Sequence, residues 1–189
     1  MSFDRALTAV LKMEGGYSNN PKDPGGETFC GISRRFWPAW PGWVLVDRAL
    51  RRGEPLMAVP GLSALVRQFY LTEFWVPLRC PEIDGTSPEI AEELFEASVN
   101  TGRSNGVKFL QRALDVLSAG KLYPLLSHDG IIGQKTMTAV MICLRQRGPR
   151  MLEDCQNGEQ YIYYKGWSGH KDFPGVFRRI SPGMFNRAD

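Results

Sequence analysis

The stretch MEGGYSNNPKDPGGETFCGIS occupies residues 13–33 and decides how the rest of the chain is interpreted. It sets Glu14 against two glycines and follows with Asp23, a second pair of glycines and Thr28. Glycine lets the backbone approach a bulky ligand without a Cβ in between. The segment therefore predicts a site in which two carboxylates and a hydroxyl lie in a glycine-rich loop.

Two carboxyl groups in different surroundings are what cleavage of a glycosidic bond requires. One must hold its proton near neutral pH, and the other must stay ionised to activate water or stabilise the sugar cation. Glu14 continues an apolar helical face over residues 3–14, and Asp23 lies in a polar loop. A solvated helix end followed by a Pro-Gly-Gly turn fits the same residues, so spacing alone leaves both interpretations open.

The longer pattern is specific enough to resemble known families. The order Glu14, Asp23, Thr28, Gly31-Ile32 resembles the Glu, Asp, Thr arrangement of phage-type lysozymes, although those have one more residue between Asp and Thr. In detail, residues 14–33 resemble glycoside hydrolase family 108, whose usual pattern is E-G-G-Y-x-N-x-P-x-D-x-G-G-x-T-x-x-G-I. The resemblance implies a mainly α, lysozyme-like helical fold with a small β element near the N-terminus.

Family 108 enzymes are N-acetylmuramidases found as phage endolysins and secretion-associated muramidases. The resemblance implies a bacteriolytic cell-wall hydrolase that cuts the β-1,4 bond between N-acetylmuramic acid and N-acetylglucosamine. It makes Glu14 the general acid, Asp23 the second carboxylate, Thr28 a holder of water or substrate and Tyr17 a substrate contact. The analogy with phage-type enzymes favours inversion, which a Glu14–Asp23 separation of about 6.5–9.5 Å would allow.

Further candidates lie outside this motif. FEASVNTG, residues 95–102, is similar to the family segment F-D-x-x-V-N-x-G, which implies that Asn100 contacts substrate; a plain helix-terminal Asn fits equally. Trp37 and Trp40 in RRFWPAWPGW offer faces that stack on sugars or cover a core. Arg34 and Arg35 could meet acidic peptide stems, and Glu82 and Asp84 are alternative second carboxylates.

The second half of the chain has its own signature. FLQRAL followed by HDGIIGQKT, within residues 109–136, resembles the predicted peptidoglycan-binding portion of such proteins. We expect Asp129 and Gly130 to set a turn, and Gly133 and Thr136 to start the next helix. The expected organisation is a catalytic part over residues 1–103 and a peptidoglycan-binding helical part over 104–189, packed as one compact unit.

Apolar periodicity and turn residues predict the remaining elements. Ser87 followed by Pro88 is typical of a helix start. A small strand or hairpin is expected within 28–33. Helices are expected over residues 3–14, 45–52, 61–75, 88–100, 105–120 with Ser104 as cap, 136–148 and 150–164, the last disturbed at Gly158.

The composition of the chain bears on which partners and cofactors it binds. The net charge of +3 is too weak to argue for nucleic acid, although it suits a polyanionic partner such as a cell wall, and the sequence has no block of like charges. The family resemblance implies glycan strands of peptidoglycan as the partner. Four scattered cysteines and two histidines give no metal-site spacing, and no cofactor is required. Buried free thiols are favoured, with two disulfides left open, as are oligomeric state and wall chemotype.

The pattern of apolar residues also bears on location. No apolar run approaches the roughly 18 residues of a membrane span. The first residues carry Asp4 and Arg5 and lack a secretory-signal pattern, so we expect synthesis in the cytoplasm and release to the wall by a holin or a host delivery system. A lytic transglycosylase and a catalytically silent wall-binding or secretion-accessory protein remain the alternatives.

Overall fold

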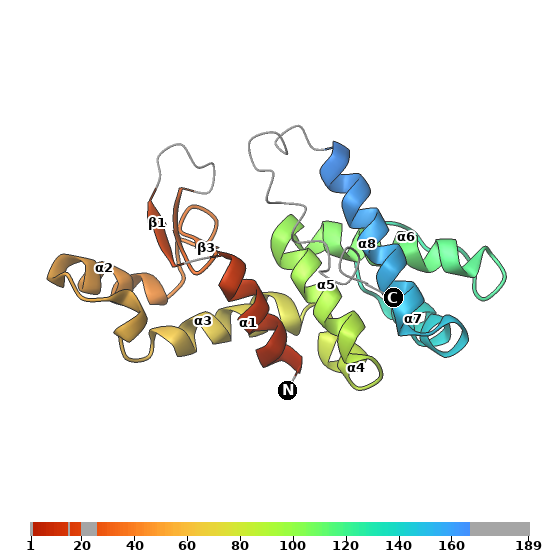
Figure 1. The fold of residues 1–189 in the computed structure, drawn as a ribbon, viewed down its shortest axis with the longest axis horizontal. Helices are drawn as coiled ribbons and strands as arrows, with labels where there is room; N and C mark the ends of the chain where they lie inside the picture. The colour runs from red at the N-terminus through yellow and green to blue at the C-terminus, as the bar shows by residue number, and fades with distance from the viewer. Residues whose placement is uncertain (1, 15, 20–25, 167–189) are drawn as a thin grey trace, which may run out of the picture. The chain divides into compact units, whose positions relative to one another are not determined.

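The computed structural model describes residues 2–14, 16–19 and 26–166, and only the backbone of residues 13 and 14. The chain divides into two compact units, here called unit 1 (Phe3–Trp75) and unit 2 (Val76–Asp189). Helices dominate both units, and a small sheet lies near the start of the chain (Figure 1). The mainly α fold with a small N-terminal β element is therefore confirmed.

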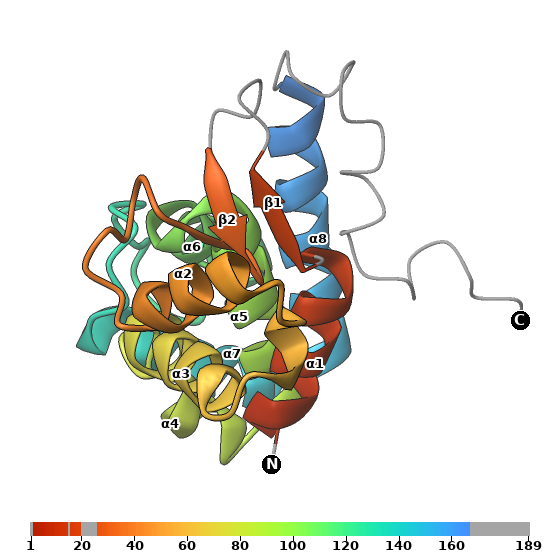
Figure 2. The same ribbon diagram turned by 90° about the vertical axis from the view of Figure 1, so that its left-hand side faces the viewer.

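Unit 1 combines helices with an antiparallel sheet. Its helices are α1 (Ser2–Glu14), α2 (Gly42–Arg52) and α3 (Leu62–Tyr70), with a 3₁₀ turn, η1 (Leu56–Ala58), before α3. A π-helical turn, η2 (Leu71–Trp75), directly follows α3. The strands β1 (Tyr17–Asn19), β2 (Glu27–Phe29) and β3 (Ile32–Ser33) pair in the order β1-β2-β3. Figure 2 shows β1 and β2 side by side.

The first helix forms where its apolar residues predict it. Phe3, Ala6, Leu7 and Val10 recur on one face of α1, and each is less than a tenth exposed. Complete burial of such a side chain contributes roughly 1.5–3 kcal/mol, far more than helix propensity does. The ring of Phe3 lies 5.3 Å from the ring of Trp75, so α1 packs on the π-helical turn.

A two-residue turn closes the second half of the sheet. Phe29 pairs with Ile32, and Cys30 and Gly31 between them have φ of 49° and 78°. Two positive φ angles in a two-residue hairpin match the twist of the flanking strands. The Tyr70 hydroxyl donates to the Cys30 carbonyl at 2.8 Å, which holds the turn against α3. The expected strand or hairpin is thus a three-stranded meander that also includes β1.

The helix α2 begins three residues earlier than expected. Pro41 precedes it with helical φ and ψ, and Trp43, Val46 and Ala49 form its buried face. A proline with its fixed φ is compatible with a helix start, so the proline-rich run ends in a helix rather than preventing one. The predicted start at residue 45 was therefore wrong.

Helices are the only regular secondary structure in the described residues of unit 2. Its helices are α4 (Cys80–Asp84), α5 (Pro88–Thr101), α6 (Arg103–Ser118), α7 (Gln134–Arg147) and α8 (Pro149–Gly166). Helices α5, α6 and α8 pack on one another and bury Ile90, Leu94, Leu110, Leu114 and Leu152 completely. Ser87 caps α5 as predicted, because its Oγ accepts from the Ile90 amide. The short helix α4 was not predicted.

A single residue separates α5 from α6. Gly102 has φ of 89° and ψ of 146°, and it stands at the N-cap of α6. Ser104 therefore lies in the first turn of α6 and does not cap it, contrary to the prediction. Beyond the bend, Gly106 meets Ser98 so closely that a Cβ at Gly106 would lie 2.1 Å from the Ser98 Oγ.

The last described helix continues through Gly158. Residues Leu152, Gln156, Gln160 and Tyr164 recur at helical spacing on its buried face, on both sides of the glycine. Glycine costs about 1 kcal/mol in a helix interior. Packing of this face on α6 and α5 exceeds that cost, so the predicted disturbance at Gly158 was wrong.

The cysteines of the chain are free thiols. Cys30, Cys80 and Cys143 are buried and Cys155 is half-buried. Burial raises the pKa of Cys30 to about 11, which keeps this thiol protonated near neutral pH. Among the residues that the structure describes, no helix is both long and apolar enough to cross a bilayer.

Candidate active site

The predicted catalytic residues lie between the last residue of α1 and the strand β2. Glu14 is the last residue of α1, and its side chain lies outside the described atoms. Asp23 lies outside the described residues. Thr28 is the middle residue of β2, opposite Ser18 on β1 and Ser33 on β3. This register sets three hydroxyl-bearing residues in one row across the sheet.

Strand alternation fixes the direction of Thr28. Phe29, the next residue, is 2% exposed and points into the core. Successive side chains of a strand point to opposite faces, so Thr28 points away from that core. Thr28 is half-buried, so part of the residue reaches solvent. This is the placement that a water-holding threonine would need.

Tyr17 is hydrogen-bonded to a charged side chain of the neighbouring strand. Its hydroxyl donates to the Glu27 Oε1 at 3.2 Å. Burial, and then the Glu27 carboxylate, raise the pKa of Tyr17, so the phenol stays a hydrogen-bond donor. Glu27 thereby fixes the phenol ring of a residue that the sequence proposes as a substrate contact.

Arg34 holds this network to α2. Its Nε lies 2.7 Å from the Glu27 Oε2, and its Nη1 lies 3.2 Å from the Asp47 Oδ2. Its guanidinium carbon also sits 4.3 Å from the centre of the Trp43 ring. The guanidinium therefore already binds two carboxylates and an aromatic face. A contact from Arg34 to acidic peptide stems does not fit this arrangement.

Sequence reasoning missed Glu27 and Asp47 as partners in the site. Glu27 occupies a variable position of the motif, and Asp47 lies 20 residues further on in α2. Only the antiparallel pairing of β1 with β2 brings Tyr17 toward Glu27. The one local signal is the basic Arg34 directly after a strand, which predicts no particular partner.

The three tryptophans of RRFWPAWPGW have different environments. Trp40 and Trp43 are 7% and 3% exposed, and their indole N–H groups donate to the carbonyls of Leu65 and Trp37. Trp37 is half-buried and packs edge-on against Phe69, with ring centres 4.9 Å apart. Trp40 and Trp43 are thus mainly core residues, whereas Trp37 keeps an accessible part.

A pocket opens beside these rings. It has a volume of about 370 Å³ and lies between residues 36–41 and the side of α3 and η2. Phe36, Trp37, Trp40 and Phe69 supply aromatic walls. Gln68, Thr72 and Glu73 add polar groups. Both tryptophans that the sequence proposes as substrate contacts therefore line one concave site in unit 1.

Unit 2 contains the other proposed contact, Asn100, in the last turn of α5.

Two glutamates of the same helix have raised pKa values. Burial, with Glu96 and Glu153 nearby, raises the pKa of Glu93 to about 8. Burial and Glu92 raise the pKa of Glu96 to about 7. Both carboxyl groups can hold a proton near neutral pH, a property that no sequence motif indicated for Glu93.

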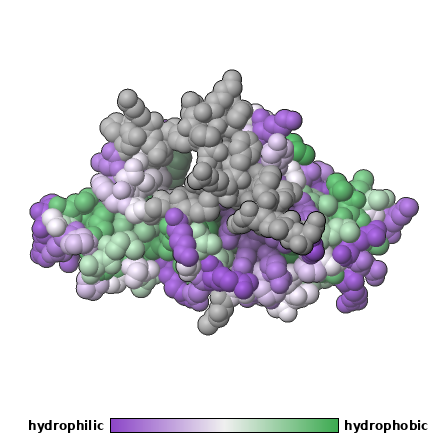
Figure 3. Space-filling view, in the orientation of Figure 1, coloured by the Kyte–Doolittle hydropathy of each residue, from purple (hydrophilic) through white to green (hydrophobic). Residues whose placement is uncertain are grey.

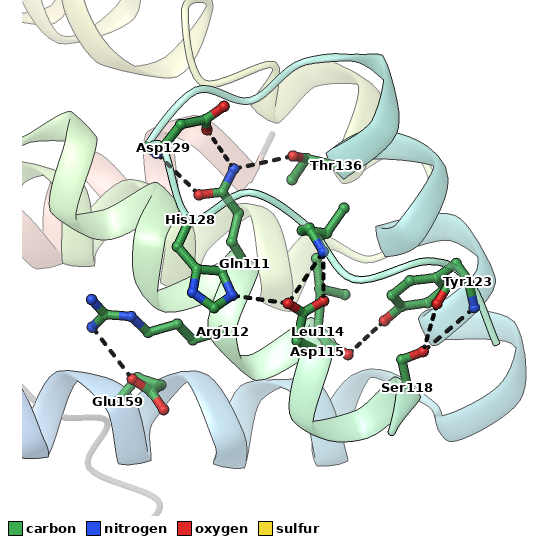
Figure 4. A network of polar contacts seen from close by, with 12 residues as sticks. Gln111, Arg112, Leu114, Asp115, Ser118, Tyr123, His128, Asp129, Thr136 and Glu159 are labelled. Carbon is green, nitrogen blue, oxygen red and sulfur yellow. Dashed lines mark hydrogen bonds and ion pairs between the residues drawn. The ribbon is translucent and has the colours of Figure 1, made fainter. Parts of the chain in front are cut away.

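The DG signature of unit 2 builds a structural turn, as predicted. The Gln111 side-chain amide donates to the Asp129 Oδ1 at 2.9 Å and to the Thr136 Oγ1 at 3.3 Å (Figure 4). Its Oε1 accepts from the Gly130 amide at 3.1 Å. Gly133 stands at the N-cap of α7. Gln111 is 1% exposed, so this residue of the FLQ motif organises the turn from within.

A second carboxylate fixes the same connection (Figure 4). The Asp115 Oδ1 accepts from the Leu126 amide at 3.1 Å, and its Oδ2 lies 2.9 Å from the His128 Nε2. These contacts satisfy backbone groups of a segment that has no helix or strand of its own. Ser118 also contributes, because its Oγ accepts from the Leu122 and Tyr123 amides. The segment between α6 and α7 is therefore held by three side chains of α6.

The alternative carboxylates have other surroundings. Glu82 is exposed and forms an ion pair with Arg79, whose hydrogen bond lowers the pKa of Glu82. Asp84 ends the short helix α4. Within the part of the chain that the structure describes, no three His, Cys, Asp or Glu side chains gather as metal ligands.

Two family models match successive parts of the chain. The family model described as Glycosyl hydrolase 108 matches residues 7–102, and the model described as Predicted Peptidoglycan domain matches residues 105–168. The solved structure of Brucella abortus SagA is similar in fold, with a TM-score of 0.64 and 22% identity, covering 100% of this chain and 97% of that one. No curated protein matches the sequence.

The two family matches describe a glycosidase part and a peptidoglycan part. The first match contains Glu14, Asp23, Thr28 and Asn100, and it spans more than half of the chain. The second match supports peptidoglycan as the polymer that the chain binds. The chain belongs to the glycosyl hydrolase 108 family.

Proposed function

We propose that the chain is an N-acetylmuramidase, which hydrolyses the β-1,4 bond between N-acetylmuramic acid and N-acetylglucosamine in peptidoglycan. The observation that carries the proposal is the family match over residues 7–102, which includes the whole stretch from Glu14 to Thr28. The peptidoglycan match in the second half supports the choice of polymer.

In the proposed reaction Glu14 is the general acid that protonates the leaving oxygen. It ends α1 in helical spacing with the buried Leu7 and Val10, which suits a carboxyl group that must keep its proton. Asp23 is the second carboxylate, and it activates the attacking water. Thr28, on the face of β2 opposite the buried Phe29, holds that water, which favours inversion at the anomeric carbon.

The remaining proposed residues bind the glycan strand. Tyr17, oriented by Glu27, donates a hydrogen bond to a sugar oxygen. Asn100 offers an amide from the last turn of α5. Trp37 and Trp40 line an aromatic pocket on which a sugar ring can stack. We propose that the enzyme reaches the wall through a holin or a host delivery system, as a bacteriolytic protein.

The bond that is cut can be identified from the products. Purified sacculi are digested, the new reducing ends are reduced with borohydride, and the reduced amino sugar is determined after acid hydrolysis. Reduced muramic acid supports the proposal. Reduced glucosamine would instead define a glucosaminidase. Products lighter by one water and resistant to reduction would define a lytic transglycosylase.

Binding without cleavage is the third possible outcome. If the protein sediments with sacculi but releases no reducing ends, the chain is a wall-binding or secretion-accessory protein. Asp23→Asn separates the roles further. We expect it to abolish hydrolysis while leaving sedimentation with sacculi intact, because the second carboxylate acts in chemistry and not in docking.

A further inference from the structure

The aromatic pocket of unit 1 has polar lining residues that the catalytic motif does not include. Its volume of about 370 Å³ falls in the range of roughly 300–1,000 Å³ that is typical of small-ligand sites. Hydrophobic residues gather on the surface over α2 and α3 in Figure 3, and Phe36 of the pocket is 67% exposed. Gln68 and Thr72 add exposed polar groups one helical turn apart.

The indole N–H of Trp37 differs from those of Trp40 and Trp43 in its hydrogen bonding. The indole N–H groups of Trp40 and Trp43 donate to backbone carbonyls at 3.4 and 2.8 Å. Trp37 has no such partner for its N–H among the described residues. Phe69 packs edge-on against the Trp37 ring. This contact fixes the orientation of the ring, and its indole N–H can donate to a ligand. Tryptophans of this kind combine an apolar face with a polar edge.

The backbone next to the pocket is also unusual. The helix α3 changes to the π-helical turn η2 at Leu71, and Thr72 and Glu73 of that turn line the pocket. Single π turns within helices are rare and frequently mark functional sites, because they redirect side chains. The Thr72 hydroxyl donates to the Gln68 carbonyl at 2.9 Å, which leaves its lone pairs as acceptors.

We infer that this pocket binds one N-acetylhexosamine ring of the glycan strand, with Trp37 as the stacking platform and Gln68 and Thr72 as polar partners. A pyranose ring has an apolar face of C–H groups and a rim of hydroxyls, which matches an aromatic wall bordered by polar side chains. The inference rests on the proposed function, from which it takes the glycan strand as ligand.

The polar rim favours a sugar over an apolar protein segment. The exposed amide of Gln68 and the hydroxyl of Thr72 can pair with ring hydroxyls and the acetamido group, whereas a purely apolar segment would leave them unpaired. A ring held there would anchor the strand by contacts separate from the reacting carboxylates. Gln68 and Thr72 are therefore substrate-positioning residues that the sequence motif did not indicate.

The test is a titration with tetra-N-acetylchitotetraose in the Glu14→Gln background, followed by NMR of the indole N–H groups. The signal that is absent in Trp37→Phe identifies Trp37, and we expect that signal to shift on titration. We expect Trp37→Ala to weaken binding about tenfold and Gln68→Ala several-fold. The control Val44→Ala alters an exposed apolar residue outside the pocket and should bind normally.

A Trp37 signal that stays in place while other signals shift would overturn the inference. So would a shift produced by a sugar-free stem peptide and not by the oligosaccharide. Gln68→Ala changes an exposed side chain, so its binding result stands even if Trp37→Ala is unstable. Failure of the proposed function is distinct, since the wild-type protein would then yield no reduced muramic acid from sacculi whatever the titration shows.

Discussion

At the scale of single residues, Arg34 ties the hairpin to α2. It links Glu27 of β2 to Asp47 of α2 and stacks on Trp43. We expect Arg34→Met to lower the free energy of unfolding by about 1–2 kcal/mol, because two half-buried carboxylates lose their partner. Arg34→Lys should be more stable than Arg34→Met but less stable than the wild type, since lysine cannot form the forked contacts of a guanidinium.

Urea unfolding measures this effect, and Arg48→Met, which alters an exposed arginine of α2, is the matched control. The control should change the unfolding free energy by less than about 0.5 kcal/mol. Equal losses in the two variants would mean that the Arg34 network contributes no more than an ordinary surface charge.

Glu93 makes the stability of unit 2 depend on pH. Its pKa is raised to about 8 in the folded state by burial and by Glu96 and Glu153, against about 4.3 in an unfolded chain. The folded state therefore binds the proton more tightly, and stability falls as pH rises from about 4.5 to about 8. The side chain of Glu93→Gln carries no charge at any of these pH values. The unfolding free energy of the variant should therefore rise relative to that of the wild type over this window, by up to about 1.4 kcal/mol per pH unit.

Urea unfolding of both proteins at several pH values between 5 and 8 checks the slope. The difference in unfolding free energy should widen steadily with pH in favour of the glutamine variant. Parallel stability curves would mean that Glu93 ionises as freely when folded as when unfolded.

At the scale of elements, the turn of Cys30 and Gly31 shows how the sheet is held to α3. The Tyr70 side chain is 1% exposed, and its hydroxyl pairs with the Cys30 carbonyl. Tyr70→Phe leaves that buried carbonyl without this donor, so we expect a loss of about 1–2 kcal/mol in unfolding free energy. Tyr163→Phe is the control, because the more exposed Tyr163 hydroxyl has no hydrogen bond in the described part of the chain. Similar losses in both would contradict this account of the turn.

Two glycines of unit 2 should respond to alanine with opposite signs. A Cβ at Gly106 would lie 2.8 Å from the Ser98 Cα, so Gly106→Ala must push α5 and α6 apart, at a cost of about 1–3 kcal/mol. A Cβ at Gly158 meets nothing within 4 Å, so Gly158→Ala should stabilise α8 by about 0.5–1 kcal/mol. Thermal unfolding of both variants gives the signs directly. A destabilised Gly158→Ala would contradict the continuous helix.

The elements that sequence predicts best are those with long apolar rows. Helix α1 and the start of α5 follow from periodicity and capping, because these signals are local. The continuity of α8 at Gly158 does not, because packing on α5 and α6 overrides a local preference. The π turn η2 is equally invisible in sequence, since residues 61–75 read as one helix. The Glu27–Arg34–Asp47 network also depends on strand pairing that no local signal predicts.

At the scale of the whole molecule, the chain joins two tasks that a wall-degrading enzyme needs. The match over residues 7–102 is that of a glycosidase family, and the match over residues 105–168 is that of a peptidoglycan domain. Within unit 2, Gln111 and Asp115 hold the connection between α6 and α7 from inside. Both side chains therefore stabilise the helical scaffold of unit 2.

The central claim, that Glu14 supplies the proton for cleavage of peptidoglycan, is tested most directly by reducing-end release from purified sacculi. General acid catalysis contributes about 10²–10⁴-fold, so Glu14→Gln should lower the rate by at least about 100-fold. Glu54→Gln, which removes a half-exposed carboxylate paired with Arg52, should release reducing ends at the wild-type rate. Full activity of Glu14→Gln would contradict the account.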